Sequence, residues 1–282
     1  MTATVDQAEF WNGPGAQRWV QHQELLDRTL EPFGRAALQA ARPQRGEAVL
    51  DVGCGCGWTS LELAQAVAPG GSVLGVDVSA PMLEVARRRA GERGLDSASF
   101  VVADAATHSP GRRFDLLFSR FGVMFFDDPV AAFSNLRRAV GPGGRLTFVC
   151  WGPVADNPWF RVPMAAAGTV VPLPEPTPPD APGPFSFADR GRVQGILERA
   201  GFAEIAVEPS SGPFVLGPDV ETAGTNAVET GPVSRLLIDA DEPTRLRVRD
   251  AIRQQLGPFL GHGGVVLPSA TWIVRARQTR SG

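Results

Sequence analysis

The sequence predicts an α/β fold in which a mostly parallel β-sheet carries helices on both faces. First, apolar runs alternate with amphipathic runs over residues 48–152, and strands that alternate with helices favour a parallel sheet with right-handed crossovers. Second, the first apolar run leads into a turn that contains alternating glycines. Third, a lone acid, Asp77, ends the next apolar run, about twenty residues after that turn. At 282 residues the chain is long enough for one large domain, with or without a cap.

The glycine turn is the most informative local feature of the chain. A strand ends at Asp51, and a helix begins at Trp58. The turn between them contains Gly53, Gly55 and Gly57. Glycine adopts positive φ freely and lets a ligand approach the backbone without a Cβ in the way. A carboxylate at the end of the second parallel strand, such as Asp77, meets ribose hydroxyls in nucleotide-binding folds. We therefore expect an adenosine-containing cofactor at this turn.

The spacing of the glycines narrows the choice of cofactor. A dinucleotide-binding turn reads G-x-G-x-x-G and binds a pyrophosphate at the helix N-terminus. This turn reads G-x-G-x-G, and Asp51 places a negative charge beside it. That charge is unfavourable for a pyrophosphate, but it suits a cofactor that carries a cationic amine or a sulfonium.

Four further motifs follow the turn in order along the chain. They are Val76–Ser79 with Met82 and Leu83, Ala103–Ala105, Phe114–Ser119 and Leu136–Leu146. Together with Val49–Gly57, they resemble the motifs of the Rossmann-like S-adenosylmethionine-dependent methyltransferases, in particular small-molecule enzymes related to ubiquinone and menaquinone biosynthesis. The resemblance implies that S-adenosylmethionine is the cofactor and that S-adenosylhomocysteine is the product. It also implies a seven-stranded sheet in which the last strand is antiparallel.

The turn and the resemblance together assign a set of residues to the cofactor. In that set Asp77 binds the ribose, Asp104 accepts the adenine amino group, and Trp19 closes over the methionine end. The full set is Trp19, Asp51, Gly53, Gly55, Gly57, Asp77, Val78, Met82, Asp104, Ala105, Ser119 and Phe121. Arg120 lies between Ser119 and Phe121 in the sequence. It is either a residue of the site or part of a surface ion pair.

Hydrophobic periodicity and turn residues give the expected elements. Strands are expected at 48–52, 73–77, 99–102, 114–119, 144–151, 203–209 and 265–276. Helices are expected at 58–67, 80–93, 128–140, 190–200 and 243–257. The first 47 residues read as amphipathic helix.

This pattern divides the chain into four parts. They are an N-terminal helical cap at 1–47, the cofactor-binding core at 48–152, a proline-rich lid at 153–188, and the completion of the core at 189–282 with a helical insertion at about 217–260. Most prolines of the lid lie between Val171 and Pro184. So many prolines are incompatible with a helix or a central strand. It reads either as a flexible linker or as an ordered loop over a pocket, and the aromatic residues on both sides favour the loop.

The composition excludes several classes of protein. The chain has no lysine and no tyrosine, so it lacks the lysine of a P-loop, a Schiff-base lysine, and the Tyr-Lys pair of short-chain dehydrogenases. A net charge of −3 gives no general attraction to nucleic acid or to anionic membranes. No signal peptide and no membrane span are apparent, so we expect a cytoplasmic location. Whether the chain forms a homodimer is left open.

The candidate catalytic residues are few. Methyl transfer from a sulfonium is an in-line displacement, so some enzymes of this kind need no dedicated base. Where a base is needed, His22 and His262 are the candidates, and no spacing among the histidines and cysteines suggests a metal site.

Aromatic and apolar residues after the fourth and fifth strands and beside the proline-rich segment predict the acceptor site. The set is Met124, Phe125, Trp151, Trp159, Phe185 and Phe187. It predicts a small hydrophobic or aromatic acceptor, methylated on oxygen or carbon. Two alternatives remain: a noncatalytic cofactor-binding or regulatory subunit of the same fold, and an NAD-dependent oxidoreductase.

Overall fold

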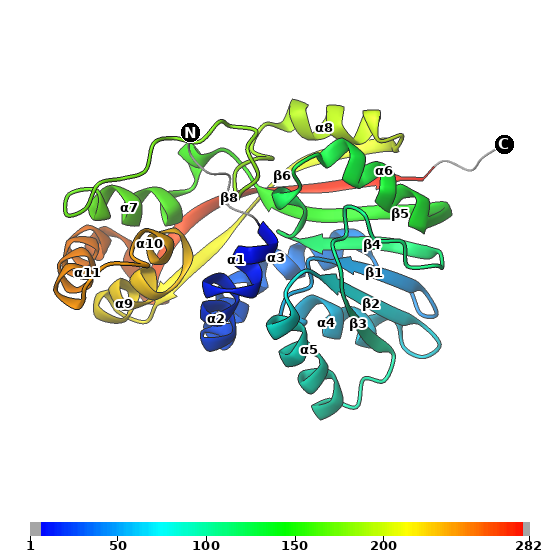
Figure 1. The fold of residues 1–282 in the computed structure, drawn as a ribbon, viewed down its shortest axis with the longest axis horizontal. Coiled ribbons are helices and arrows are strands. Elements are labelled where there is room, and N and C mark those ends of the chain that lie inside the picture. The colour runs from blue at the N-terminus through cyan, green and yellow to red at the C-terminus, as the bar shows by residue number, and fades with distance from the viewer. Residues whose placement is uncertain (1–6, 279–282) are drawn as a thin grey trace.

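The computed structural model describes residues 7–278 as one sheet covered by helices (Figure 1). The sheet follows the order β3-β2-β1-β4-β5-β8-β6, and the two-residue β7 pairs with β8. The strands are β1 Ala48–Val52, β2 Ser72–Asp77, β3 Ala98–Val102, β4 Phe114–Arg120, β5 Val140–Trp151, β6 Ala203–Gly217, β7 Leu260–Gly261 and β8 Gly264–Arg277. The first five strands are parallel, and β8 runs antiparallel between β5 and β6. The predicted α/β class and the antiparallel last strand are confirmed. The sheet has the seven expected strands and, in addition, the short β7.

The helices form layers on both faces of this sheet. In Figure 1, α6 and α8 lie above it, and α4 and α5 lie below it. The long helices are α3 Gln23–Ala41, α4 Trp58–Val67, α5 Ala80–Glu92, α6 Pro129–Ala139, α7 Pro158–Ala167, α8 Arg190–Arg199, α9 Val220–Glu229 and α11 Glu242–Leu256. The shorter ones are α1 Gln7–Asn12, α2 Pro14–Gln21, α10 Gly231–Leu236 and the 3-10 turns η1 Val123–Phe125, η2 Val154–Asp156 and η3 Gly257–Phe259.

Capping residues explain where several helices begin. The side chains of Ser79, Asp128 and Asp189 accept hydrogen bonds from backbone N–H groups in the first turns of α5, α6 and α8. Such N-caps satisfy donors that have no partner inside the helix. Ser79 and Asp189 directly precede the expected helices at 80–93 and 190–200, and Asp128 is the first residue of the expected helix at 128–140, so the three predicted starts agree with the structure to within one residue.

The strand β6 is longer than the sequence predicts. The expected strand ends at residue 209, but β6 continues through Pro209 and Pro213 to Gly217 and pairs with β8 along its length. Because β6 is at the edge of the sheet, a proline that cannot donate to the ladder is tolerated there. The long β6 and β8 reach beyond the core and carry α9, α10 and α11, which gather with α7 at the left of Figure 1.

The N-terminal segment forms three helices. Pro14 begins α2 at a position where its missing N–H costs nothing, and α3 continues through Pro32. The beginning of the predicted cap, residues 1–6, lies outside the described residues. From residue 7 to residue 278, no helix is both long and apolar enough to cross a bilayer.

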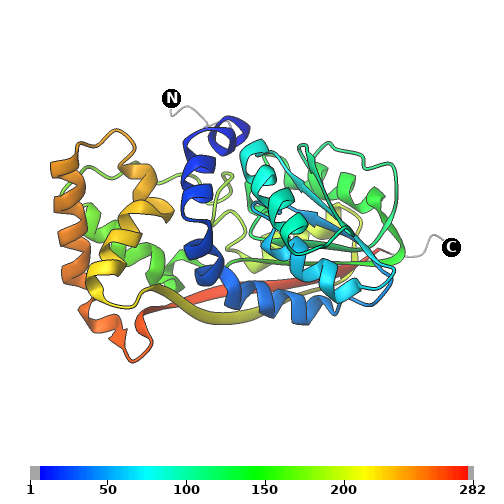
Figure 2. The same cartoon turned by 90° about the horizontal axis from the view of Figure 1, so that it is seen from below.

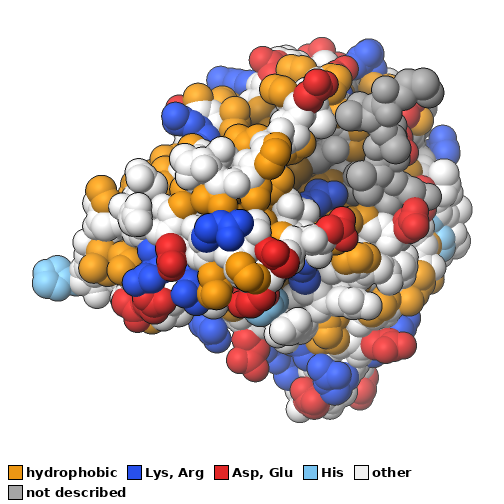
Figure 3. Space-filling model, turned by 60° about the vertical axis from the view of Figure 1, so that its left-hand side comes forward, with side chains coloured by type: hydrophobic (Ala, Val, Ile, Leu, Met, Phe, Trp, Pro, Cys, Tyr) orange, Lys and Arg blue, Asp and Glu red, His pale blue; other side chains and the backbone are white. Residues whose placement is uncertain are grey.

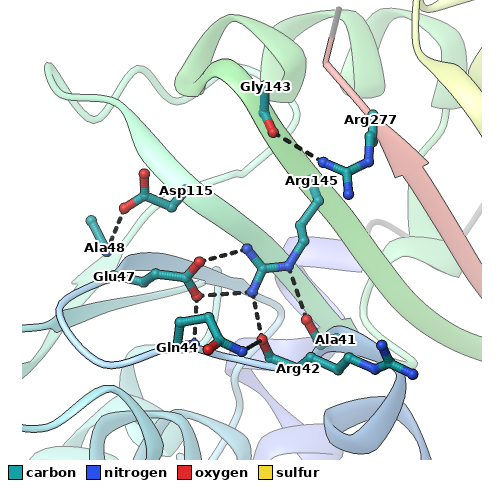
Figure 4. A network of polar contacts seen from close by, with 9 residues as sticks. All are labelled: Ala41, Arg42, Gln44, Glu47, Ala48, Asp115, Gly143, Arg145 and Arg277. Atoms are coloured by element: carbon teal, nitrogen blue, oxygen red, sulfur yellow. Dashed lines mark hydrogen bonds and ion pairs between the residues drawn. The ribbon is translucent and has the colours of Figure 1, made fainter.

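Arg145 ties the end of α3 to the sheet (Figure 4). Its guanidinium donates to the carbonyl oxygens of Ala41 and Arg42 and makes a two-pronged pair with Glu47, at 2.7 and 2.8 Å. A planar guanidinium matches a carboxylate in this way and also satisfies carbonyls left free at a helix end. The clamp lies at the amino-end edge of the sheet, opposite the edge where ligands bind in such folds.

Asn157 ties the start of the predicted lid to the sheet. Its fully buried amide donates to Gly152, Pro153 and Ala270 carbonyls. Its Oδ1 accepts from the Ala270 N–H and from the Trp159 indole. One side chain therefore joins the end of β5, the beginning of α7 and the middle of β8.

We predict that Asn157→Ala lowers the free energy of unfolding by about 2–4 kcal/mol, because several buried polar groups lose their partner. Chemical denaturation monitored by circular dichroism measures the change. Gln194→Ala is the control, since Gln194 is exposed and its side-chain amide donates to Glu198 one turn along the same helix. Equal stability of the two variants would contradict the role assigned to Asn157.

Candidate functional site

Three charged side chains lie on one face of the sheet near its carboxyl edge. Asp51 is opposite Gly75 of β2 and opposite Phe118 of β4. Side chains alternate along a strand, so Asp77 and Arg120, each two residues further on, point to the same face as Asp51. The helices α3 and α4 cover this face.

The glycines of the turn have different roles. All three have positive φ, at 67°, 54° and 86° for Gly53, Gly55 and Gly57. A Cβ at Gly53 would lie 2.7 Å from the Cα of Gly122, and one at Gly57 would lie 2.8 Å from the Cβ of Ala86. A Cβ at Gly55 would lie 3.9 Å from its nearest neighbour, the sulfur of Met82. The outer glycines thus allow close packing, whereas Gly55 leaves its backbone open to a ligand.

Asp77 is fixed by backbone donors. Its Oδ2 accepts from the N–H of Gly55 at 2.8 Å, and its Oδ1 accepts from the N–H of Ser79 at 2.9 Å. Burial raises the pKa of this carboxyl, and the two N–H groups oppose that rise. The carboxylate therefore joins the glycine turn to the start of α5, with its position set by the backbone.

Asp51 is fully buried and only half satisfied. Its Oδ2 accepts from the hydroxyls of Thr59 and Ser60, both at 2.6 Å. Its Oδ1 has no hydrogen-bond partner. Burial raises the pKa of Asp51 to about 6, although the two hydroxyls and the charge of Arg120 act against the rise. An unpaired buried carboxylate oxygen favours a cationic donor.

Arg120 is buried, with 9% of its side chain exposed. It pairs with Asp27 at 3.7 Å, and its guanidinium lies 5.1 Å from the ring centre of Trp58. Burial lowers its pKa, and the carboxylates of Asp27 and Asp51 act in the opposite direction. The interpretation as a surface ion pair is therefore wrong.

The N-terminal helices cover this edge of the sheet (Figure 2). Trp19 packs with Met82 beside Ala16 of α2. Trp11 lies edge-on to both Trp19 and Phe125, with ring centres 5.7 Å apart in each pair. Through these contacts α1 and α2 reach both α5 and the turn η1.

The same helices bridge to two other parts of the molecule. The amide of Asn12 donates to the Val78 carbonyl and accepts from the Ala80 N–H. On the other side, Arg18 donates to the Ser234 carbonyl, and Arg235 lies over the ring of Phe10. The cap thus touches both the loop after β2 and the helical insertion.

Aromatic rings fill the space next to the charged residues. Phe121, whose φ is +61°, stacks on Trp151 at 4.2 Å. Trp151 packs against Trp159 at 4.5 Å, and Trp159 stacks on Phe214 at 4.6 Å. A strained non-glycine residue at this position fits a functional turn. We call Phe121, Trp151, Trp159 and Phe214 the aromatic row.

The remaining predicted acceptor residues lie in different surroundings. Met124 accepts a hydrogen bond at its sulfur from the N–H of Trp151, and Phe185 packs against Trp159. Phe125 instead contacts the cap. Phe187 is 1% exposed and packs with Phe133 and Phe148 in the core beneath α6, so the structure does not bring it to the aromatic row.

The proline-rich segment is anchored rather than free. Ser186 and Gly183 both donate to the carbonyl oxygen of Met124, at 2.6 and 3.1 Å. The indole of Trp272 donates to the Ala188 carbonyl. These bonds hold the segment against the turn that follows β4, and α7 at its start is helical rather than loop.

The two histidines predicted as candidate bases, His22 and His262, lie apart from each other. His22 connects α2 and α3, and its Nε2 is 3.9 Å from a carboxylate oxygen of Glu229 in the insertion. His262 is exposed in the turn between β7 and β8, a hairpin that Figure 2 places below the helical insertion and away from the core. The structure thus does not bring His262 to the charged residues.

The third predicted acid is at the surface. Asp104 is exposed after β3 and accepts from the Ala106 N–H at 2.8 Å, while Ala105 next to it is buried. Ser119 is fully buried and donates from its hydroxyl to the Val52 carbonyl at 2.8 Å. It joins the ends of β1 and β4 from inside.

Sequence reasoning missed Asp27, Asn12 and Phe214. Asp27 reads as a polar residue on an amphipathic helix, and Asn12 as part of a Gly-Pro turn. The alternation of side chains along β1 and β4 contained a signal for Arg120, but using it requires the register between the two strands.

Comparison with known proteins matches the central part of the chain to a family. Residues 49–144 match the family described as Methyltransferase domain. Residues 49–144, about a third of the chain, are therefore similar to a methyltransferase domain. The matched residues of this methyltransferase domain run from β1 into β5 and include the glycine turn, Asp77 and Arg120.

Curated relatives match parts of the chain. It is 40% identical over 118 residues to the aklanonic acid methyltransferase DauC of a Streptomyces species, covering 42% of this chain and 54% of that protein. It is 31% identical over 185 residues to the nocamycin O-methyltransferase of Saccharothrix syringae, covering 62% and 65%. It is 38% identical over 137 residues to the demethylmenaquinone methyltransferase of Thermus thermophilus, covering 46% and 61%. The matches therefore span less than two thirds of each relative.

Solved structures share the fold. The YcgJ protein of Bacillus subtilis has a TM-score of 0.57 at 18% identity, covering 90% of this chain and 99% of that chain. The [4+2]-cyclase SpnF has a TM-score of 0.55 at 18% identity, covering 89% and 82%. At these identities the likeness concerns the fold alone.

We predict that the Asp51 carboxyl makes stability depend on pH. Its pKa is raised in the folded protein to about 6 from 3.8, so the folded state keeps a proton that the unfolded state releases as pH rises. The free energy of unfolding of the wild type relative to Asp51→Asn should therefore fall by roughly 2 kcal/mol between pH 4 and pH 7. Urea denaturation across that range measures it.

Asp241→Asn is a control for which the stability difference from the wild type should change with pH in the opposite direction. Hydrogen bonds from Thr244 lower the pKa of Asp241, so the advantage of the wild type over that variant should grow as pH rises. A difference between wild type and Asp51→Asn that stays constant with pH would contradict the assigned environment of Asp51.

Proposed function

We propose that the protein transfers a methyl group from S-adenosylmethionine to an oxygen, or a carbon, of a small hydrophobic or aromatic metabolite. The observation that carries the proposal is the open backbone at Gly55 between two buried carboxylates, one of which has a free oxygen. A positively charged nucleoside cofactor satisfies both features, whereas a pyrophosphate satisfies neither.

The residues of this edge fit the cofactor part by part. Asp77 is suited to ribose hydroxyls, because it is fixed at the end of β2 beside the open turn. The free Oδ1 of Asp51 is suited to a cationic group. Met82 and Trp19 supply apolar contacts next to the turn. When bound, S-adenosylmethionine supplies a methyl group on a positively charged sulfur.

The role of the protein in such a reaction is to position the acceptor and exclude water. The aromatic row begins at Phe121, directly beside the charged residues, and leads toward Phe185 of the lid. Flat rings of this kind suit a flat acceptor and attract a nearby cation by roughly 0.5–2 kcal/mol. Holding the nucleophile, methyl carbon and sulfur in line supplies most of the catalysis.

The need for a base depends on the acceptor. A carboxylate or an acidic phenol reaches the site already ionised and needs no proton acceptor. The name of the nocamycin O-methyltransferase supports an oxygen acceptor, and the name of the aklanonic acid methyltransferase supports an acidic small molecule. His22 remains the candidate base for a less acidic hydroxyl, with Glu229 beside it.

Two alternatives remain open. A noncatalytic or regulatory protein of the same fold is one, and the likeness to a [4+2]-cyclase illustrates that this fold also occurs in proteins named for another reaction. An NAD-dependent oxidoreductase is disfavoured by the glycine spacing and by the charge of Asp51. The face in Figure 3 intersperses basic with acidic side chains, which supports a small-molecule partner over nucleic acid. A cytoplasmic location and a homodimer stay predictions.

We predict that wild type binds S-adenosylhomocysteine in isothermal titration calorimetry and that Asp77→Asn binds it about 10- to 100-fold more weakly, since charged hydrogen bonds to the ribose are lost. Asp115→Asn is the matched control. Its carboxylate also accepts a backbone N–H, from Ala48, but at the amino-end edge of the sheet (Figure 4). Absence of binding to the wild type would overturn the proposal.

Methyl transfer is tested separately with isotopically labelled S-adenosylmethionine. A panel of aromatic carboxylic acids, phenols and quinols is incubated with the protein, and mass spectrometry detects labelled products. Cofactor binding without a product from any acceptor would favour the noncatalytic alternative.

A further inference from the structure

Arg120 has a buried N–H group that nothing in the described protein satisfies. Its Nη1 is buried and lacks a hydrogen-bond partner. Leaving a donor of a charged group unpaired in the interior is costly, so such a group in a native protein calls for an explanation. A bound anion is one, because a guanidinium pairs with carboxylates at short distance and with fixed geometry.

The nearby carboxylate does not satisfy Arg120. Asp27 accepts hydrogen bonds from Arg89 at 2.8 Å and from Gln23 at 2.5 Å, both at its Oδ2. Arg120 reaches only the Oδ1 of Asp27, at 3.7 Å through its Nη2. The charge of Asp27 is therefore shared between two arginines, and the Nη1 of Arg120 is left for another partner.

Packing holds the guanidinium in place. A Cβ at Gly34 of α3 would lie 3.2 Å from the Cδ of Arg120 and 2.5 Å from the ring of Trp58. The helix thus presses against both side chains, and the guanidinium lies over the Trp58 ring. An arginine fixed in this way needs little reorganisation to bind an anion.

The carboxylate of Asp51 lies near Arg120 and also has a buried atom without a hydrogen-bond partner. Asp51 and Arg120 lie on the same face of neighbouring strands, with Arg120 closer to the carboxyl edge. Each has one buried polar atom without a partner, Oδ1 in Asp51 and Nη1 in Arg120. A free acceptor next to a free donor is complementary to a zwitterion, with the ammonium toward Asp51 and the carboxylate toward Arg120.

We propose that Arg120 anchors the α-carboxylate of the cofactor's amino-acid portion. The inference rests on the proposed function, and it assigns a specific contact within that site. Arg120 thereby distinguishes the complete cofactor from nucleosides that lack the amino-acid portion.

The test compares two ligands by isothermal titration calorimetry. S-adenosylhomocysteine carries the amino-acid portion, and 5′-methylthioadenosine lacks it. In Arg120→Met we expect the affinity for S-adenosylhomocysteine to fall about 10- to 100-fold, while the affinity for methylthioadenosine changes less than about threefold. Arg120→Lys should recover part of the loss. Arg35→Met is the matched control, since Arg35 lies over the same Trp58 ring from the exposed side.

The outcomes separate the two proposals. If wild type binds neither ligand, the proposed function fails. If wild type binds both and Arg120→Met weakens them equally, Arg120 is structural and the anchor is overturned; an unchanged affinity for both ligands overturns it as well. If Arg120→Met does not fold, wild type is titrated with decarboxylated S-adenosylhomocysteine. If Arg120 binds the α-carboxylate, that analogue should bind at least tenfold more weakly than S-adenosylhomocysteine. Equal affinities would overturn the proposal.

Discussion

The candidate site depends on a backbone contact between two glycines at the ends of neighbouring strands. A side chain at Gly53 would meet the Cα of Gly122, and one at Gly122 would meet both the Cα of Gly53 and the carbonyl of Val52. The hydroxyl of Ser119 donates to that carbonyl and accepts from the Gly122 N–H. Because the two turns touch directly, the side chains that leave them have fixed positions. Together with the register of β1 and β4, this contact places Asp51 and Arg120 on one face, with Arg120 two residues closer to the carboxyl edge.

This arrangement places charge where a protein interior disfavours it. Asp51, Asp77, Asp27 and Arg120 are all buried, and two of them have polar atoms without partners. Such a group costs stability unless a ligand completes it. Strong contacts elsewhere hold the strained edge in place: the Arg145 clamp fixes α3 from the opposite edge, and Asn157 fixes the lid. The cap and the aromatic row then shield the edge from water, which strengthens every electrostatic contact inside.

Local sequence signals located the core elements well. The strand at Ala48–Val52 and the helix at Trp58–Val67 have the predicted bounds, because an apolar run, three glycines and a periodic helix specify them within a few residues. Local signals did not predict features that depend on contacts with residues distant in the sequence. The continuation of β6 past Pro209 depends on its place at the sheet edge, and the burial of Phe187 depends on α6. Nothing local to Asn157 indicates that it joins β5 to β8.

The sequence by itself determined the fold class, the family motifs and the acids at the ends of the first two strands. It did so because glycine conformation and hydrophobic period act over a few neighbouring residues. Tertiary structure alone decided that Asp27 and Arg89 leave Arg120 with a free donor, that the cap bridges the cofactor loop and the insertion, and that His262 lies away from both. These facts depend on strand register and on helices distant in the chain, and burial changes the energy of a charge only once those partners are in place.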